Sequence, residues 1–312
     1  MKIMFDLVNH SNTLLINLPN MKSKIYLILF SIVLFSCSSE SDEQIGDDNL
    51  GNNLLVSEVI STDWENPDYV YTDQFIYDEN KITSITSNYS YQNNSPQNSQ
   101  VYEFTYTNNL ISRVDEYYGS NNSGQYNFSY DAQGRLSGWN YCYYNSNNNC
   151  DSEDRGSISY ASNTMIENYI NEEGTIYEDE GTIVFQLDNN ENITSFVSTY
   201  QDTDNNGDSV TVTYNGSITY DNANGIYKNI VGMTPRIYTL IVDGFIGNGL
   251  NVNNNITSYS INAGDETGTI TYAYDYNEDN YPRQITIIDD INSPDENSIV
   301  NIRTLSTNKG LC

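Results

Sequence analysis

The sequence predicts an all-β protein: a single antiparallel meander of repeated β-hairpins that forms a large curved sheet or a barrel-like half-barrel and does not span the membrane. Three observations support this prediction. Tyrosine-centred segments recur along the chain, apolar and polar residues alternate within them, and each segment ends in a turn sequence. No stretch has a convincing helical period, and 312 residues suffice for one large or two ordinary domains.

The repeat is clearest in FSYDAQGRLSGW, which begins at Phe128. Apolar residues at every second position indicate a strand with one covered face. Asp131 favours the first position of a turn through its own side-chain hydrogen bond, and Gly134 tolerates a left-handed backbone, so Asp131 to Gly134 is predicted to be a hairpin turn. Related segments begin at Phe75, Phe104, Ile158, Ile183, Ile218 and Ala273, with a degenerate candidate near Leu250. Seven or eight such hairpins predict about fourteen to sixteen strands.

The N-terminal region has the features of a targeting sequence. Residues 1–20 have no clear targeting pattern and are interpreted as a mis-called leader, which makes Met21 the true start. Lys22 and Lys24 precede the apolar run Ile25 to Phe35, which is too short for a membrane-spanning helix and typical of a signal peptide over residues 21–36.

The apolar run ends at Leu34-Phe35-Ser36-Cys37, which resembles a bacterial lipobox, although Phe35 departs from its usual pattern. Cleavage and acylation at Cys37 would anchor the chain in the outer-membrane lipid, since each buried CH₂ contributes about 0.8 kcal/mol. Residues 37–52 are predicted to form an acidic flexible tether before a β-hairpin-repeat domain at 53–312. The run from Ser38 to Glu43 resembles the export tag of surface lipoproteins of Bacteroidota, with an ordinary solvated linker as the alternative.

The charge restricts the partners. The chain has 12 basic and 42 acidic residues, a net charge of −30. Cleavage before Cys37 removes Lys2, Lys22, Lys24 and Asp6, which leaves 9 basic and 41 acidic residues. This balance excludes nucleic acid and anionic membrane surfaces as partners, because phosphates would be repelled. Divalent cations and neutral sugars remain compatible.

With Cys37 acylated, three cysteines remain. Cys142 and Cys150 bracket a short polar loop, so a disulfide across a hairpin is predicted in an oxidising envelope, with two free thiols as the alternative. Cys312 has no evident partner.

The segment from Tyr130 to Leu136 resembles the YD repeat of Rhs-type proteins. The lipobox, acidic tether and F-x-Y-D-x-x-x-x-I units together resemble a family of Bacteroidota lipoproteins described as a domain of unknown function with a porin-like fold. The terminal YDYNEDNYPRQI, from Tyr274 to Ile285, is also similar to that family's pattern. The resemblance covers most of residues 54–304. It implies a curved antiparallel sheet or barrel-like shape and no known activity.

A membrane-spanning barrel is the alternative fold. Such a barrel needs an outward apolar band, whereas these strands have one apolar set, which a core requires. The predicted N-terminal acylation and the final Gly310-Leu311-Cys312 also differ from what such barrels carry.

The catalytic repertoire is narrow. The only histidine, His10, precedes the predicted signal peptide, which excludes His-dependent hydrolysis and His-based zinc sites in the processed chain. The glycines from Gly244 to Gly249 have no surrounding βαβ unit and are interpreted as a bulge or loop. No spacing singles out a carboxylate pair, so we expect no enzyme activity.

One acidic loop matches the first half of a calcium-binding loop. Asp202, Asp204 and Asn206 supply oxygens at alternate positions, followed by Gly207 and Asp208. Thr213 stands where an EF-hand needs Glu, so an EF-hand is excluded. Calcium binding at Asp202, Asp204, Asn206 and Asp208 stays a hypothesis beside that of an ordinary hairpin tip.

The 28 tyrosines and two tryptophans provide the other candidate site. Alternation places Trp139, Tyr141 and Tyr143 on one strand face beside the cysteine loop, where they could stack on sugar rings or form the packed face of the sheet.

The sequence therefore predicts a surface-exposed, lipid-anchored, non-enzymatic protein that binds polysaccharide or another extracellular ligand. A structural or assembly lipoprotein that contacts an outer-membrane partner or surface protein is the alternative, and a polysaccharide-degrading enzyme is a third.

Overall fold

The computed structural model describes residues 54–62, 68–91, 97–173, 179–203, 209–243, 250–263, 266–289 and 297–306. They belong to the compact unit Asn52–Cys312. The predicted leader, signal peptide, Cys37 and tether lie outside the described residues, as do Gly244 to Gly249 and Cys312. In the described part, no helix is both long and apolar enough to cross a membrane.

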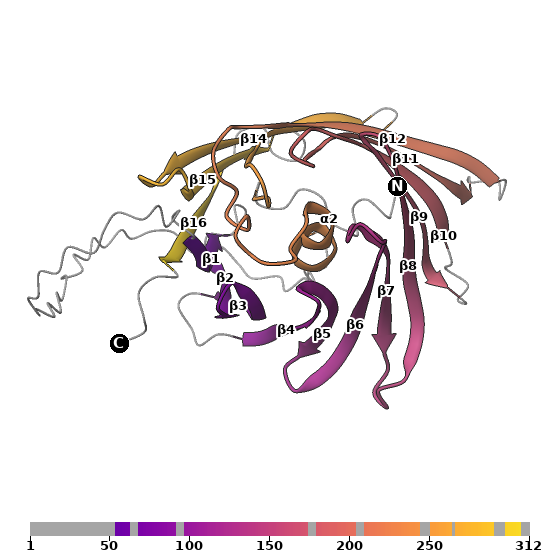
Figure 1. Ribbon diagram of the computed structural model, residues 1–312, viewed down its shortest axis with the longest axis horizontal. Coiled ribbons are helices and arrows are strands. Elements are labelled where there is room, and N and C mark those ends of the chain that lie inside the picture. Colours follow the sequence, from indigo (N-terminus) through magenta and orange to yellow (C-terminus); the bar gives the residue numbers. More distant parts are fainter. Residues whose placement is uncertain are drawn as a thin grey trace, which may run out of the picture. The chain divides into compact units, whose positions relative to one another are not determined.

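Sixteen antiparallel strands pair in chain order, and pairing of the first with the last closes them into a barrel (Figure 1). The all-β meander of hairpins is confirmed, and the seam between the first and last strands closes the predicted half-barrel. The strands are β1 (Leu54–Thr62), β2 (Tyr69–Asp78), β3 (Lys81–Tyr91), β4 (Gln97–Thr107), β5 (Leu110–Tyr118), β6 (Asn121–Tyr130), β7 (Leu136–Tyr144), β8 (Cys150–Ala161), β9 (Thr164–Glu173), β10 (Asp179–Leu187), β11 (Ile193–Thr203), β12 (Ser209–Tyr220), β13 (Ile256–Ala263), β14 (Glu266–Tyr276), β15 (Pro282–Asp289) and β16 (Asn297–Ser306).

The predicted turn at Asp131 to Gly134 is confirmed. The Asp131 carboxylate accepts hydrogen bonds from the backbone N–H groups of Gln133 and Arg135, both at 2.9 Å. Gly134 has a φ of 78°, where a residue without Cβ meets no steric penalty. Equivalent side-chain bonds start the turns at Asp188 and Asn277. One local turn chemistry therefore joins several pairs of strands.

The repeated tyrosine of each unit connects neighbouring hairpins. Its ring lies on the lumen side, and its hydroxyl bonds the backbone of the first or second residue of the second strand in the preceding hairpin. The tyrosines that do so are Tyr106, Tyr130, Tyr160, Tyr220 and Tyr274. The spacing of the repeat thus serves contacts between units as well as strand formation within each unit.

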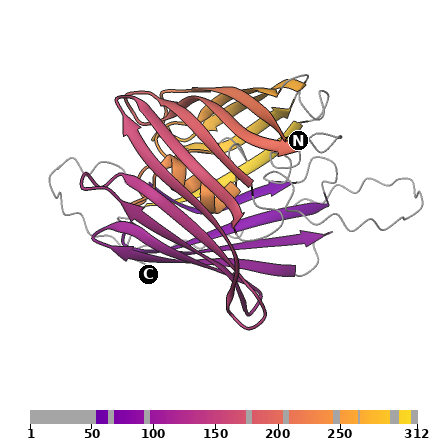
Figure 2. The ribbon, with the colours of Figure 1, turned by 90° about the vertical axis from the view of Figure 1, so that its right-hand side faces the viewer.

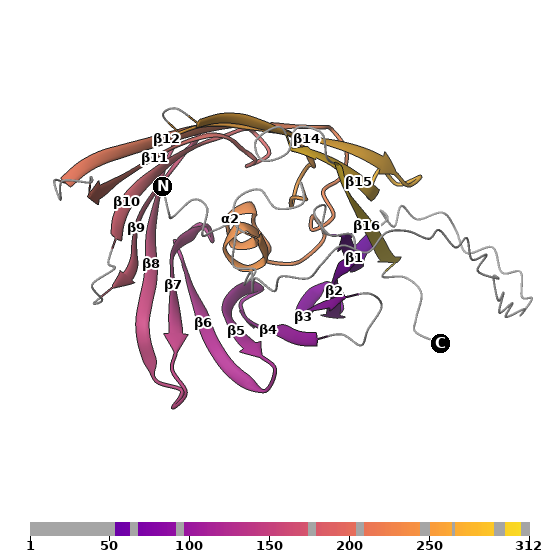
Figure 3. The same cartoon turned by 180° about the vertical axis from the view of Figure 1, so that it is seen from behind.

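The turn between β12 and β13 is replaced by a long insert, residues 222–254, that fills part of the lumen (Figures 1, 2 and 3). The insert contains the short helix α2 (Pro235–Tyr238) and the π-helical turn η1 (Thr239–Asp243). Thr234 caps α2 by accepting a hydrogen bond from Ile237 N–H, and Pro235 starts it.

The insert corrects the repeat assignment made from sequence. The sequence pattern assigns the segments beginning at Ile218 and near Leu250 to separate units, but they are the two halves of one hairpin. Asp221 still pairs with Asn255 as a turn aspartate does: its N–H bonds the Asn255 carbonyl, and its carboxylate accepts from Asn255 N–H. The hydrogen bonds of a turn are therefore present although a long insert separates Asp221 from Asn255. The sequence pattern of the turn does not reveal this insert.

The two faces of the wall differ sharply in polarity. Inward positions such as Val114, Phe185 and Ile285 are completely buried. The outward positions of β12 are Thr211, Thr213, Asn215, Ser217 and Thr219, all exposed. Exposed aliphatic residues on the outer wall of the described strands are scattered, as at Ile76 and Val197. A membrane-spanning barrel has the opposite distribution, with an apolar outer band, so the prediction of a non-spanning barrel agrees with this wall.

Candidate functional site

A groove of about 940 Å³ crosses the wall of the barrel from β6 to β11. The direction of the side chains that line it follows from Trp139. The Trp139 indole points into the lumen, where it donates to Glu167 at 2.8 Å, and Glu167 in turn pairs with Arg236 of the insert. Because side chains alternate along a strand, Asn140 points to the opposite face, which is the outer wall. The groove therefore lies on the outside of the barrel.

Two rows of outward residues form the groove, and each row crosses the strands in register. The first, named here the hydroxyl–amide row, contains only neutral groups: Ser129, Gly138, Ser157, Asn168, Thr182 and Thr199. The second, named the mixed row, carries one cation and one anion: Asn127, Asn140, Arg155, Ile170 and Glu180.

Glycines explain why a convex wall has a groove here. A Cβ at Gly156 would collide with the indole of Trp139, and a Cβ at Gly181 would collide with the ring of Tyr169. Each inward aromatic ring thus occupies the space of the missing side chain on the neighbouring strand. Glycine within a strand marks such close approach and allows a sheet to bend. The backbone of both glycines forms part of the groove lining.

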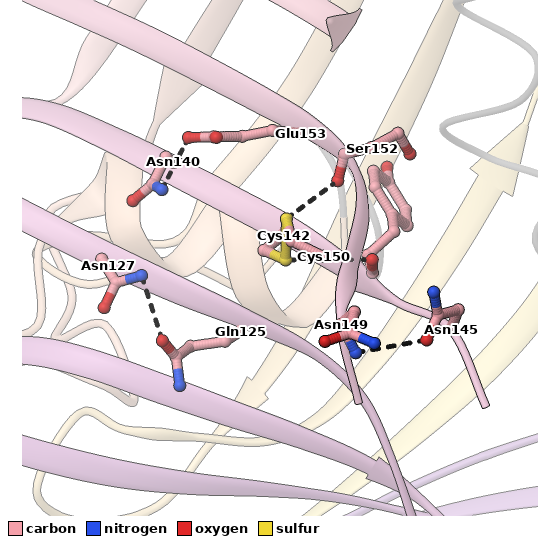
Figure 4. The surroundings of a disulfide bond; sticks show 10 residues. Gln125, Asn127, Asn140, Cys142, Asn145, Asn149, Cys150, Ser152 and Glu153 are labelled. Carbon is pink, nitrogen blue, oxygen red and sulfur yellow. Dashed lines mark hydrogen bonds between the residues drawn. A yellow bond between two sulfur atoms is a disulfide. The ribbon is translucent and has the colours of Figure 1, made fainter. Parts of the chain in front are cut away.

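Hydrogen bonds fix several polar side chains in the groove. The Asn140 amide donates to Glu153 Oε1 at 2.7 Å, and the Asn127 amide donates to Gln125 Oε1 at 3.2 Å (Figure 4). On the hydroxyl–amide row, the Thr182 hydroxyl donates to Asn168 Oδ1 at 2.9 Å. These groups are oriented before any ligand arrives, which lowers the entropy cost of binding.

The predicted cysteine pair lies beside the groove. Cys142 and Cys150 form a disulfide with an S–S distance of 2.09 Å and a Cα–Cα distance of 5.5 Å. Cys142 lies two residues from Asn140 on the outer face of β7, and Figure 4 shows the bond close to Asn140 and Glu153. The disulfide joins β7 to β8 at the loop end of the groove wall.

Trp139, Tyr141 and Tyr143 share one strand face, and that face is the lumen. Tyr141 is buried and donates to Glu116 Oε2 at 2.5 Å, while Tyr143 is 38% exposed and donates to Asp154 Oδ2 at 2.6 Å. Burial raises the pKa of the Asp154 carboxyl, although the bonds from Tyr143 and the Glu172 N–H oppose the shift. Burial also raises the pKa of Tyr143. These aromatics pack against one another and bond to acids of the inner wall.

The proposed calcium ligands are only partly visible. Asp202 lies near the end of β11 on the same strand face as the buried Tyr200, whereas Asp204, Asn206 and Asp208 lie outside the described residues. Within the ranges that the structure describes, no group of three or more His, Cys, Asp or Glu side chains is placed to hold a metal ion.

Of the residues that line the groove, the sequence singles out Trp139, and its indole points into the lumen; no sequence pattern marks the outward polar residues. The available signal was the set of isolated glycines inside strand patterns, Gly138, Gly156 and Gly181, because such a glycine marks a bend or a close backbone approach. The partners of those glycines lie on other strands, so no local pattern predicts the groove.

The fold and the groove define a closed β-barrel with an insert in its lumen and a polar outer wall. The chain is similar to two solved structures of porin-like proteins. One, from Bacteroides uniformis, is 12% identical with a TM-score of 0.48, over 80% of this chain and 96% of that chain. The other, from Bacteroides vulgatus, is 11% identical with a TM-score of 0.41, over 80% of this chain and 98% of that chain. No protein-family model and no curated protein matches the chain.

Proposed function

We propose that this chain is a non-enzymatic, lipid-anchored cell-surface protein that binds a neutral polysaccharide in the groove of its outer wall. The observation that carries the proposal is the groove itself: about 940 Å³ in volume, lined by oriented amide and hydroxyl groups over a floor of glycine backbone. Amide and hydroxyl side chains both donate and accept hydrogen bonds, which matches the hydroxyl groups of sugars.

Charge supports a neutral ligand over an anionic one. The chain carries a net charge of −30, and the groove lining contains Glu153 and Glu180 against the single cation Arg155. A polyanion would meet net repulsion both at a distance and in the groove. A neutral polymer meets none and exchanges its bonds to water for bonds to fixed side chains.

The anchor completes the proposal. Acylation of Cys37 after removal of residues 21–36 would hold the chain in the outer membrane, and residues 38–52 would separate the barrel from the lipid. A polar outer wall suits a barrel that stands in water at the end of such a tether.

The test is retention of the domain at residues 53–312 on a panel of neutral and anionic polysaccharides, with calcium and with chelator. The barrel closes on itself within the unit Asn52–Cys312, so the domain is expected to fold alone. We expect retention on a neutral glycan, lost in the variant Asn140→Ala/Asn168→Ala. The matched control is Asn215→Ala, an exposed asparagine on the outer wall of β12. Absence of retention on every glycan would favour the assembly role instead.

A further inference from the structure

The groove is elongated across the strands. The hydroxyl–amide row runs over six neighbouring strands, β6 to β11. Adjacent strands lie about 4.8 Å apart, so five steps span about 24 Å, whereas the two rows are separated along each strand by two residues, about 7 Å. A groove more than three times longer than the distance between its rows fits an extended chain better than a compact molecule.

The recognition groups repeat along that length. Every strand from β6 to β11 contributes one member of the hydroxyl–amide row, and none of the six is charged. Gly138 is buried and has no polar side chain, so the hydrogen-bonding groups of the row come from the other five strands. A site that reads the end of a sugar chain would instead have polar groups converging on one point.

The centre of the row shows how two adjacent strands would bind one sugar unit. Thr182 donates its proton to Asn168 Oδ1, which leaves the Thr182 oxygen as an acceptor and the Asn168 amide nitrogen as a donor. Donor and acceptor lie side by side on adjacent strands, which matches the neighbouring hydroxyl groups of a sugar ring. Both side chains are held in place by their mutual bond.

We propose that the ligand is a linear, unbranched neutral polysaccharide that lies across the strands along the hydroxyl–amide row and is bound through its internal sugar units. This inference rests on the proposed function and specifies its substrate class. It requires that affinity depend on the length of the chain and that both ends of the row, Ser129 on β6 and Thr199 on β11, contribute to it.

The experiment titrates the domain with oligosaccharides of increasing length, prepared from whichever neutral polysaccharide retains it, by calorimetry. Affinity is expected to rise with each added unit until the oligomer spans about 24 Å and then to stay constant. Ser129→Ala and Thr199→Val are each expected to weaken binding of the longest oligomer about three- to tenfold, the loss of one hydrogen bond. Asn168→Ala is expected to weaken binding of every length.

Thr213→Val is the matched control, because Thr213 continues the row on β12 but lies outside the groove lining. Thermal melts of all variants check folding. Affinity that is already maximal for a disaccharide, or that responds to only one end of the row, would overturn internal recognition while the proposed function stands. Failure to bind any polysaccharide would overturn both.

Discussion

The hydroxyl of Tyr130 donates a hydrogen bond to the carbonyl of Ile111, 19 residues earlier, at 2.5 Å. Ile111 is completely buried and lies at an irregularity in the pairing of β4 and β5, where the ladder is interrupted. Tyr160 makes the same bond to Leu136 at 3.0 Å, and Tyr220 makes it to Ile193 at 2.8 Å. The tyrosine of the repeat therefore satisfies a buried carbonyl of the preceding unit, which explains why the repeat keeps it.

Tyr130→Phe is expected to destabilise the barrel by about 1–3 kcal/mol, because the buried carbonyl of Ile111 loses its partner. Urea unfolding measures the change. Tyr118→Phe is the control, since Tyr118 is 49% exposed, and it is expected to change stability by less than about 0.5 kcal/mol. Equal effects of the two substitutions would show that the bond between units contributes nothing.

Glu167→Ala is expected to cost about 3–5 kcal/mol. Glu167 is fully buried and binds Arg236 of the insert at 2.6 and 2.7 Å, so its removal leaves a buried guanidinium without its carboxylate. Thermal and urea unfolding test this. The exposed pair of Arg283 and Asp275 provides the control, because Asp275→Ala is expected to cost no more than about 1 kcal/mol.

A second measurement on the same pair separates ion pairing from packing. If the unpaired guanidinium causes the loss of stability in Glu167→Ala, the double variant Glu167→Ala/Arg236→Ala will lose less stability than the two single variants lose together. Strict additivity would mean that the two side chains act independently and that the insert is held in the lumen by other contacts.

Replacement of Cys142 and Cys150 by serine is expected to lower stability by about 2–3 kcal/mol, because the disulfide closes a short loop in the unfolded chain. The measurement is urea unfolding with and without a reductant. The reductant is expected to shift the native chain toward the double variant and to leave the double variant unchanged. Identical unfolding of the two oxidised proteins would rule out a stabilising disulfide.

Burial of Asp73 predicts that the stability of the barrel falls as pH rises. Burial raises the pKa of its carboxyl above 3.8, and the bond from the Ser87 hydroxyl at 2.6 Å opposes the shift only partly. Because the raised pKa favours the protonated form in the folded state, stability contributed by that form is present below pH 3.8 and is lost as pH rises through the folded pKa.

The measurement compares the native chain with Asp73→Asn from pH 3 to pH 8. The native chain is expected to lose stability relative to the variant as pH rises, and the difference is expected to level off once Asp73 is ionised in the folded state. Any constant effect of the amide on packing cancels, because only the change with pH is compared. A difference that does not vary with pH would contradict a raised pKa.

Much of the local structure could be predicted from the sequence. Alternation in segments such as that from Phe128 gives strands, and Asp131 with Gly134 gives the turn, because both signals act within a few residues. The shared face of Trp139, Tyr141 and Tyr143 follows from the same alternation. Alternation alone does not say whether that face is the lumen or the outer wall.

By itself the sequence determined the hairpins with short turns and their order, since these depend on backbone preferences and side-chain bonds between near neighbours. Only the tertiary structure decided that β16 returns to β1, that the chain between Asp221 and Asn255 enters the lumen, and that Gly156 and Gly181 lie under aromatic rings of other strands. These features join residues far apart in the chain, and closure of the barrel is what sorts one face inward. The hydroxyl–amide row of the groove depends on this closure, because it consists of outward neutral residues that six strands bring into register.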